Sequence, residues 1–233
     1  VKSTTLFAVL NQLNDIEKNI VTIEDPVEYQ LDGINQVQAK EKTGLTFAKT
    51  LRSILRQDPD IIMVGEIRDQ ETAQIAVRAA LTGHLVLSTL HTNDSVSTIT
   101  RLIDMGIPPY LVGSTVIGVV AQRLVRKLCD ECKVKYNPGP EEKMFLDIDE
   151  DKEIYKAGES QCKNCNSSGF KGRVAIQEVF LVDEKIEEMI TKSASEAEMK
   201  KYARENGMIT LTEDGKDKVE KGLTSYQEVA RLI

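Results

Sequence analysis

The cysteines of this chain occur as two C-x-x-C pairs, Cys129 with Cys132 and Cys162 with Cys165, which together account for all 4 cysteines. A metal ion bound by both pairs would hold together two segments that residues 133–161 separate. Four thiolates fill the tetrahedral shell of one zinc ion, so we expect a structural zinc site rather than a catalytic one. The alternatives are two disulfides in a secreted protein or a redox-active pair, although neither pair has surroundings of the Trp-Cys-Gly-Pro-Cys type.

Composition limits the kinds of partner that we expect. The chain has 233 residues, 41% of them hydrophobic, which is enough for one core and a smaller attached part. Its net charge of −7 disfavours non-specific nucleic-acid binding, so no nucleic-acid partner is expected, and the basic stretch 123–127 is interpreted as a solvated edge near the cysteines. No apolar run is long enough to cross a bilayer, so we expect membrane contact only through partners.

The first half of the chain alternates short strands with helices. Apolar runs predict strands at 20–26, 33–38, 60–66 and 84–91, and helical patterns cover 4–13, 47–56, 71–81 and 95–105. Asn93 or Asp94 is expected to cap the last of these helices, which ends before Pro108 and Pro109. This alternation predicts an α/β fold with a largely parallel sheet covered by helices on both faces.

The second half is expected to return to the core and end in helices. We predict a strand at 174–181 and helices at 184–191, 196–206, 211–221 and 226–232. The polar, acidic stretch 137–159 lies inside the loop between the cysteine pairs, and we expect it to be a mobile excursion.

Charged side chains follow three of the predicted strands. Glu24, Asp25 and Glu28 end the first, Glu66 and Arg68 end the third, and His91 ends the fourth. Because active sites of parallel sheets lie at the carboxyl ends of the strands, we expect these side chains to form a site.

The first residues suggest what this site binds. Lys2, Ser3 and Thr4 stand at the start of the first helix and match the end of a P-loop, G-x-x-x-x-G-K-[ST]. In such a loop the lysine meets the phosphates of ATP and the adjoining hydroxyl binds Mg²⁺. The motif gains weight from the apolar strand ending in Glu66, where the Walker B acid of a P-loop enzyme is expected.

Long stretches of the chain resemble the secretion ATPase superfamily, in particular the motors of type IV pilus assembly and type II secretion. Among them are IVTIEDPVEYQLDGINQVQ, DPDIIMVGEIRDQETAQIAVRAALTGHLVLSTLHTNDS and GFKGRVAIQEVF. The resemblance implies a RecA-like P-loop ATPase core at 1–126, a zinc-binding insertion at 127–172, and a return strand with a C-terminal helical region at 173–233. ATP, Mg²⁺ and Zn²⁺ are the implied ligands.

The resemblance also implies roles for the acids and the nucleotide-binding residues. Lys2 and Ser3 take the Walker A position, and the stretch 60–66 takes the Walker B position, with Glu66 orienting the attacking water. The acids Glu24, Asp25 and Glu28 form the aspartate box. Gly65 stands where many P-loop enzymes carry an Asp that organises Mg²⁺, so we expect Glu28 or Glu24 to supply that acid.

The only 2 histidines, His84 and His91, match the histidine box of the family. His91 is expected to report the γ-phosphate to the next subunit, whereas His84 either faces an interface or is a satisfied structural histidine. Four arginines are candidates for charge neutralisation or interfaces, without a ranking among them: Arg52, Arg56, Arg68 and Arg78.

At the level of the whole protein, the resemblance implies a homo-hexamer that acts in the cytoplasm, peripherally at the inner membrane. An inner-membrane platform protein and a cytoplasmic adaptor are the implied partners, and the four cysteines point to the extension motors rather than the retraction motors. Alternatives are a DNA-uptake or conjugation motor, and a non-hydrolysing, zinc-stabilised docking fragment. The family loop reads GPTGSGKST, whereas Val1 stands here in the place of its last glycine, so these residues alone are expected to bind nucleotide weakly.

Overall fold

The computed structural model describes residues 2–149, 151–158 and 161–232, and the chain divides into two compact units. Unit 1 comprises Val1–Val119 and Leu181–Lys201, and unit 2 comprises Val120–Phe180 and Tyr202–Ile233. The chain therefore passes from one unit to the other after Val119, Phe180 and Lys201. The three-part division at 126 and 172 stays a prediction.

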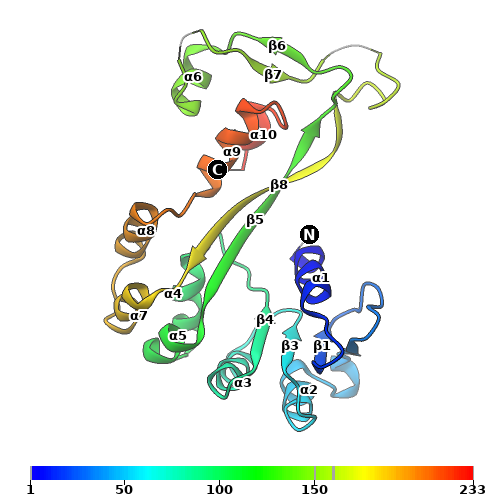
Figure 1. Ribbon diagram of the computed structural model, residues 1–233, viewed down its shortest axis with the longest axis vertical. Coiled ribbons are helices and arrows are strands. Elements are labelled where there is room, and N and C mark those ends of the chain that lie inside the picture. Colours follow the sequence, from blue (N-terminus) through cyan, green and yellow to red (C-terminus); the bar gives the residue numbers. More distant parts are fainter. Residues whose placement is uncertain (1, 150, 159–160, 233) are drawn as a thin grey trace. The chain divides into compact units, whose positions relative to one another are not determined.

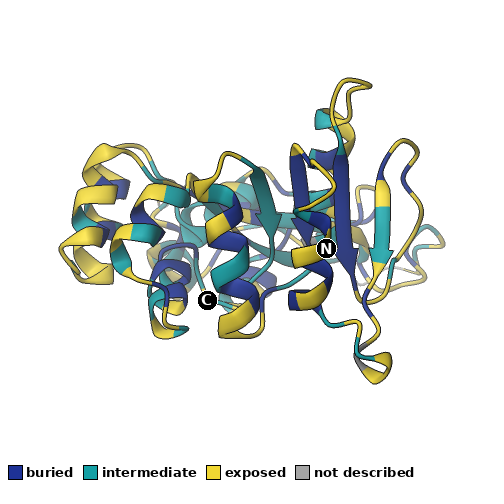
Figure 2. Cartoon of the chain, turned by 90° about the horizontal axis from the view of Figure 1, so that it is seen from below, coloured by how far each residue is buried: buried dark blue, intermediate teal, exposed yellow. Residues whose placement is uncertain are grey.

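Unit 1 is built on a parallel sheet of four strands in the order β2-β1-β3-β4 (Figure 1). The strands are β1 (Ile20–Glu24), β2 (Asn35–Gln38), β3 (Ile61–Val64) and β4 (Leu85–Ser88). All four predicted strands are confirmed, as is the parallel sheet. Every residue of β1 and β3 is buried (Figure 2), as expected of central strands with helices on both sides.

Helix α1 (Lys2–Leu13) covers one face of this sheet. Its Phe7 and Leu10 are almost fully buried and pack in one cluster with Ile20, Ile61 and Met63 of the central strands. Successive strand residues point to opposite faces, so the neighbouring residues of β1 and β3, which are also buried, must be covered from the other side.

The helices between the strands begin where the sequence predicts. Thr46 caps α2 (Phe47–Ile54) by accepting a hydrogen bond from the Lys49 amide. Asp69 caps α3 (Gln70–Leu81) by accepting bonds from the amide and the hydroxyl of Thr72 at 2.8 and 2.9 Å. A 3₁₀ turn, η1 (Glu41–Thr43), precedes α2.

The remaining helices of unit 1 include one that the sequence analysis missed. They are α4 (Ser97–Asp104), α5 (Pro109–Thr115), α7 (Glu184–Thr191) and the first part of α8 (Glu196–Glu205). Helix α4 ends before Pro108 and Pro109, as predicted, but Pro109 is also the first residue of α5, a position where a missing amide proton costs nothing. Gly113 in α5 permits close packing against Glu187 of α7.

Unit 2 is built on two long paired strands, β5 (Gly118–Leu128) and β8 (Phe170–Leu181). The basic stretch 123–127 lies within β5, so it belongs to a strand. The predicted strand at 174–181 is confirmed and begins earlier, at Phe170, whose ring lies 4.0 Å beneath the guanidinium of Arg126.

The stretch 137–159 is not a mobile excursion, and this prediction was wrong for its described residues. It contains α6 (Pro140–Leu146) and β7 (Ile154–Lys156), and β7 pairs antiparallel with β6 (Val134–Tyr136). Leu146 and Ile154 are buried in a cluster with Val219 and Val229. A few well-placed apolar residues thus order a mostly polar segment.

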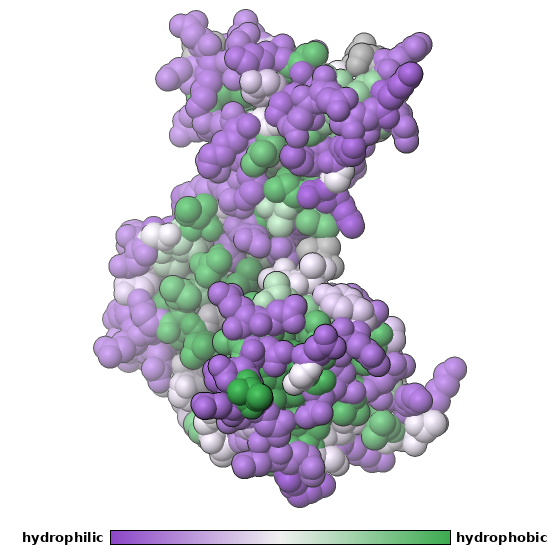
Figure 3. Space-filling view, turned by 45° about the vertical axis from the view of Figure 1, so that its right-hand side comes forward, coloured by the Kyte–Doolittle hydropathy of each residue, from purple (hydrophilic) through white to green (hydrophobic). Residues whose placement is uncertain are grey.

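The C-terminal helices are confirmed within two residues at each end: α7, α8, α9 (Leu211–Glu220) and α10 (Tyr226–Ala230). None of the described helices combines the length and the apolar character needed to span a bilayer. Hydrophilic side chains cover most of the face drawn in Figure 3, with hydrophobic ones between them.

Glu228 of α10 anchors the C-terminal segment to β5. It is 3% exposed, and its carboxylate accepts hydrogen bonds from the amide and the guanidinium of Arg126 at 3.0 and 2.8 Å. Thr224 donates to the Arg126 carbonyl at 2.8 Å. The hydrogen bond from the Arg126 guanidinium is the main reason that the pKa of Glu228 is lowered.

We expect Glu228→Gln to lower the free energy of unfolding by about 1–3 kcal/mol near pH 7, because a buried charge-assisted bond is weakened. The folded-state pKa lies below the unfolded one, so this contribution exists above pH ~4.3 and disappears as pH falls through the folded-state pKa. Urea denaturation at several pH values measures both effects. The exposed Glu141→Gln is the control and should leave the midpoint unchanged; an equal shift in both variants would contradict the assignment.

Candidate functional site

The register of the sheet brings the predicted acids to one edge. Ile23 of β1 lies beside Val64 of β3, which in turn lies beside Ser88 of β4. The residues that follow these three positions therefore leave the sheet at the same level. The edge is tied together by the Thr89 hydroxyl, which donates to the Gly65 carbonyl at 2.7 Å, and by the Ile67 amide, which donates to the Thr89 carbonyl at 3.0 Å.

Glu66 lies between two basic side chains at this edge. One carboxylate oxygen is paired with the Arg68 guanidinium, and the other lies 3.5 Å from Nε2 of His91. The Glu66 side chain is 15% exposed, whereas those of Arg68 and His91 are 62% and 79% exposed. A sheltered carboxylate with exposed nitrogen donors around it can orient a water molecule next to an anionic group.

Glu24 already has partners within the sheet. It is 4% exposed, and its Oε1 accepts hydrogen bonds from the Thr22 hydroxyl at 2.7 Å and from the Gln36 side chain at 2.9 Å. Its backbone carbonyl accepts from the Ala39 amide at 2.8 Å. These bonds fix the position where β1 ends and leave less of this carboxylate free for a ligand. The next residue, Asp25, is exposed.

The start of α1 meets the loop after β1. The Ser3 hydroxyl donates to Oε1 of Glu28 at 2.9 Å, and Glu28 is itself exposed. Hydroxyl and carboxylate oxygens are the donors that Mg²⁺ prefers, so this pair fits the ion. Thr4 is exposed on the same helix, and the side chain of Lys2 lies outside the described part of the chain.

Gly65 lies close to the backbone of the neighbouring strand. A Cβ atom at this position would lie 3.1 Å from the carbonyl oxygen of Ile23 and 3.5 Å from Cα of Glu24, both in the backbone of the neighbouring strand. A side chain at position 65 would require the carbonyl of Ile23 to shift by a few tenths of an ångström. The structure thus gives a steric reason for the glycine that the sequence shows.

His84 lies away from these acids. It precedes β4, at the end opposite to His91, and its Nδ1 lies 2.9 Å from the Ala79 carbonyl and 3.2 Å from the Thr82 hydroxyl. These contacts belong to the turn between α3 and β4. The guanidinium of Arg52 pairs with Glu71, in the first turn of α3, at 2.8 Å.

The four cysteines form a single cluster in unit 2. Their sulfur atoms all lie within 4.8 Å of one another, with Cys129 and Cys162 4.0 Å apart and Cys132 and Cys165 3.7 Å apart. A tetrahedron of sulfurs around zinc has edges of about 3.8 Å, whereas a disulfide requires about 2.05 Å. The four are free thiols, so the disulfide alternative is wrong and the cluster fits zinc.

The pKa values of two of these thiols shift in opposite directions, and burial raises that of Cys132 to about 12. Burial raises the pKa of Cys165, but a hydrogen bond from the Gly169 amide and those from the other thiols outweigh it and lower this pKa to about 7. The Asn164 side chain donates to the Cys129 sulfur at 3.4 Å. Donors aimed at sulfur favour the thiolate, which is the form that binds zinc.

Sequence reasoning missed the glycine that lets the cluster close. A Cβ atom at Gly158 would lie 1.9 Å from the carbonyl oxygen of Cys132, so any side chain would displace the first cysteine pair. The contact joins residues that are distant in sequence, and no local pattern indicates it. Thr89 was missed for the same reason.

Known proteins are similar to this chain over almost its whole length. A family model described as "Type II/IV secretion system protein" matches residues 1–231. The chain is 50% identical over 231 residues to the type II secretion system ATPase E of Vibrio cholerae, and 51% identical over 237 residues to the type IV pilus assembly ATPase PilB of Thermus thermophilus. The matches cover 99% and 100% of this chain but 46% and 26% of those proteins, so the chain spans half or less of their length.

Solved structures agree with the fold. The crystal structure of the pilus retraction motor PilT with bound ADP has a TM-score of 0.73 and 28% identity, and covers 99% of this chain and 57% of its own. The ATPase DotB of Legionella pneumophila has a TM-score of 0.70 and 26% identity, and covers 99% of this chain and 56% of its own. The α/β fold with its parallel sheet is therefore that of these ATPases.

We expect one zinc ion per chain in protein purified without chelators, measured by elemental analysis. Cys162→Ser should lose the zinc and unfold the segment around the cluster, while circular dichroism of the sheet in unit 1 persists, because metal binding is coupled to local folding. Lys163→Ser, which removes an exposed side chain within the same C-x-x-C pair, should retain the metal. Zinc well below one per chain in the unmodified protein would contradict the site.

Proposed function

This chain belongs to the family of type II/IV secretion system proteins, and from this membership we infer its function. We propose that it is the ATP-hydrolysing portion of a motor for type IV pilus assembly or type II secretion. The observation that carries the proposal is the sheet edge at which Glu66 lies between Arg68 and His91. The hydroxyl–carboxylate pair of Ser3 and Glu28, which fits Mg²⁺, adds to it. Relatives at about half identity that are named ATPases support it.

In the proposed reaction the chain positions the phosphates and a water molecule. Lys2 and the amides at the start of α1 hold the phosphates, and Ser3 with Glu28 would hold Mg²⁺, which neutralises phosphate charge when bound. Glu66 accepts a hydrogen bond from the water and holds it in line. The water oxygen bonds to the γ-phosphorus as the bond to the ADP oxygen breaks, and a proton is released with ADP and phosphate.

Sequence identity supports an extension or secretion motor over a retraction motor. The chain is 50% and 51% identical to the secretion and pilus assembly relatives, which does not separate these two functions, and 28% identical to the retraction motor PilT. Zinc bound to Cys129, Cys132, Cys162 and Cys165 would stabilise unit 2 without taking part in hydrolysis.

We further propose that the protein works as a homo-hexamer on the cytoplasmic face of the inner membrane. A platform protein in that membrane and a cytoplasmic adaptor would be its partners. This proposal is supported by the exposure of Arg68 and His91 at the site edge, where a neighbouring subunit can reach them.

In the full protein, Glu66→Gln should leave ATP binding nearly unchanged and reduce the turnover of ATP by about 10²–10⁴-fold, because the amide cannot act as the water-orienting carboxylate. Binding is measured with a fluorescent nucleotide, and turnover by phosphate release. Glu188→Gln is the control, since Glu188 also pairs with basic side chains, Lys185 and Lys192, but belongs to α7 and is not one of the proposed site residues. If turnover of the Glu66→Gln variant stays within a few-fold of the unmodified protein, Glu66 is not the carboxylate that orients the water.

Assembly is tested by mass and by concentration dependence. We expect the full protein with ATP and Mg²⁺ to form six-membered rings in light-scattering or mass-photometry measurements, with turnover per chain rising with concentration until the rings are populated. A monomer that hydrolyses ATP at the full rate would contradict the ring.

A further inference from the structure

The loop between β4 and α4 connects the site edge to a second group of contacts. It begins with Thr89, which is bonded to Gly65, and it contains His91, which lies beside Glu66. Three residues after His91 comes Asp94. Any change in the position of this loop therefore moves the groups that contact Glu66.

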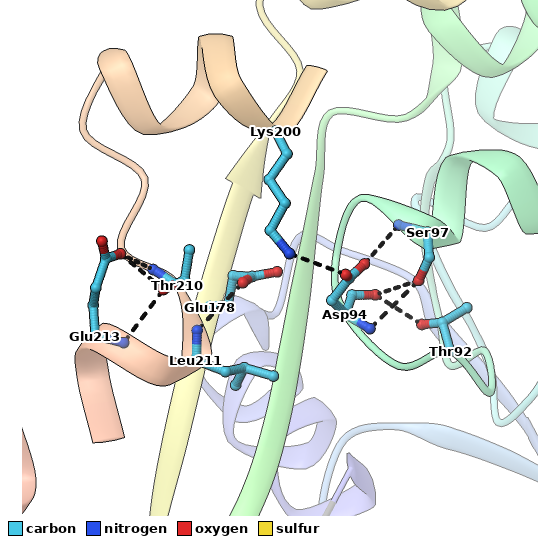
Figure 4. Close-up of polar contacts among 8 residues, drawn as sticks. All are labelled: Thr92, Asp94, Ser97, Glu178, Lys200, Thr210, Leu211 and Glu213. Carbon is cyan, nitrogen blue, oxygen red and sulfur yellow. Dashed lines mark hydrogen bonds and ion pairs between the residues drawn. The ribbon is translucent and has the colours of Figure 1, made fainter. Parts of the chain in front are cut away.

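Asp94 uses its two carboxylate oxygens for different partners (Figure 4). Oδ1 accepts a hydrogen bond at 2.8 Å from the amide of Ser97, the first residue of α4, while Oδ2 lies 3.2 Å from Nζ of Lys200. The Thr92 hydroxyl donates to the Asp94 carbonyl at 3.1 Å and lies 3.0 Å from the Thr98 hydroxyl. The position of the Asp94 carboxylate is therefore fixed by a contact that does not involve Lys200.

Lys200 comes from helix α8, 106 residues further along the chain. The start of α8 is fixed by Ser195 and Glu198, whose side chains bond to each other's amides. Met199, next to Lys200, is 2% exposed, so this part of the helix is packed. Two residues after Lys200 the chain has passed into unit 2.

We propose that the Asp94–Lys200 ion pair couples the loop carrying His91 to the point where the chain leaves unit 1, so that Asp94 and Lys200 are positioning residues for ATP turnover. This inference rests on the proposed ATPase function. The pair lies within unit 1, and neither residue touches Glu66 in the described contacts.

The Asp94 and Lys200 side chains lose less conformational freedom on pairing than two fully exposed side chains would. Exposed ion pairs contribute little because two flexible side chains must be ordered to form them. Here the side chains are 28% and 39% exposed, and the Asp94 carboxylate is already ordered by Ser97, so less entropy is lost when Lys200 binds. The pair joins the loop between β4 and α4 to α8, and each of these elements is also held by other hydrogen bonds.

The test compares catalytic parameters in the full protein. Lys200→Met keeps the aliphatic stem and removes the charge, and we expect kcat to fall about five- to tenfold while KM for ATP stays within about twofold. Lys200→Arg should retain kcat, since it restores the charge. Asp94→Asn keeps an oxygen that can accept from Ser97 and should lower kcat like Lys200→Met.

A double variant separates coupling from loss of structure. If the pair acts as a unit, Asp94→Asn with Lys200→Met should be no slower than either single variant. Lys192→Met is the matched control: it removes a lysine whose carboxylate partner, Glu188, lies on the same helix α7, and kcat should not change.

The outcomes are distinguishable. A kcat within about twofold of the unmodified protein for Lys200→Met, or single effects that multiply in the double variant, would overturn the coupling. A parallel fall of kcat and unfolding midpoint that Lys200→Arg does not reverse would assign the pair a structural role only. If the unmodified protein shows no ATP turnover at all, the proposed function fails first and this inference with it.

Discussion

The parallel hydrogen-bond ladder between β1, β3 and β4 is the constraint on which the site depends. Parallel pairing aligns the carboxyl ends of the strands, and it does so here because Ile23, Val64 and Ser88 lie side by side. A shift of one residue in this register would point Glu66 to the other face and break the bond between Thr89 and Gly65. Chemistry at the edge is therefore a consequence of burial in the strands behind it.

Unit 2 depends less on apolar burial for its stability, because its hydrophobic core is small. Beyond the paired strands β5 and β8, its described apolar cluster around Leu146 and Val229 has few residues. Polar contacts and the cysteine cluster therefore also stabilise this unit. Glu228 fixes α10 to Arg126, and the cysteine cluster joins the ends of the loop 133–161. Both devices join segments that are far apart in sequence, which a small number of apolar contacts would hold weakly.

Sequence patterns predicted what depends on local periodicity. The four strands of unit 1 and most helices followed from apolar runs and caps, and the four cysteines followed from their spacing. The order within 137–159 did not, because burial of Leu146 and Ile154 is decided by residues about 70 positions later. The partnership of Asp94 with Lys200 and the tight approach of Gly158 to Cys132 are likewise tertiary, and neither leaves a local signal.

The crowded backbone around Gly65 decides where negative charge at the metal can come from. A Cβ at position 65 would crowd the carbonyl of Ile23, which favours an acid from the neighbouring strand and its loop for the proposed Mg²⁺ site, and Glu24 is already engaged by Thr22 and Gln36. The available carboxylate, Glu28, stands on an exposed loop rather than on the rigid strand. Under the proposed function, a change in the position of the loop after β1 would therefore alter the Mg²⁺ site while β3, which carries Glu66, keeps its place in the sheet.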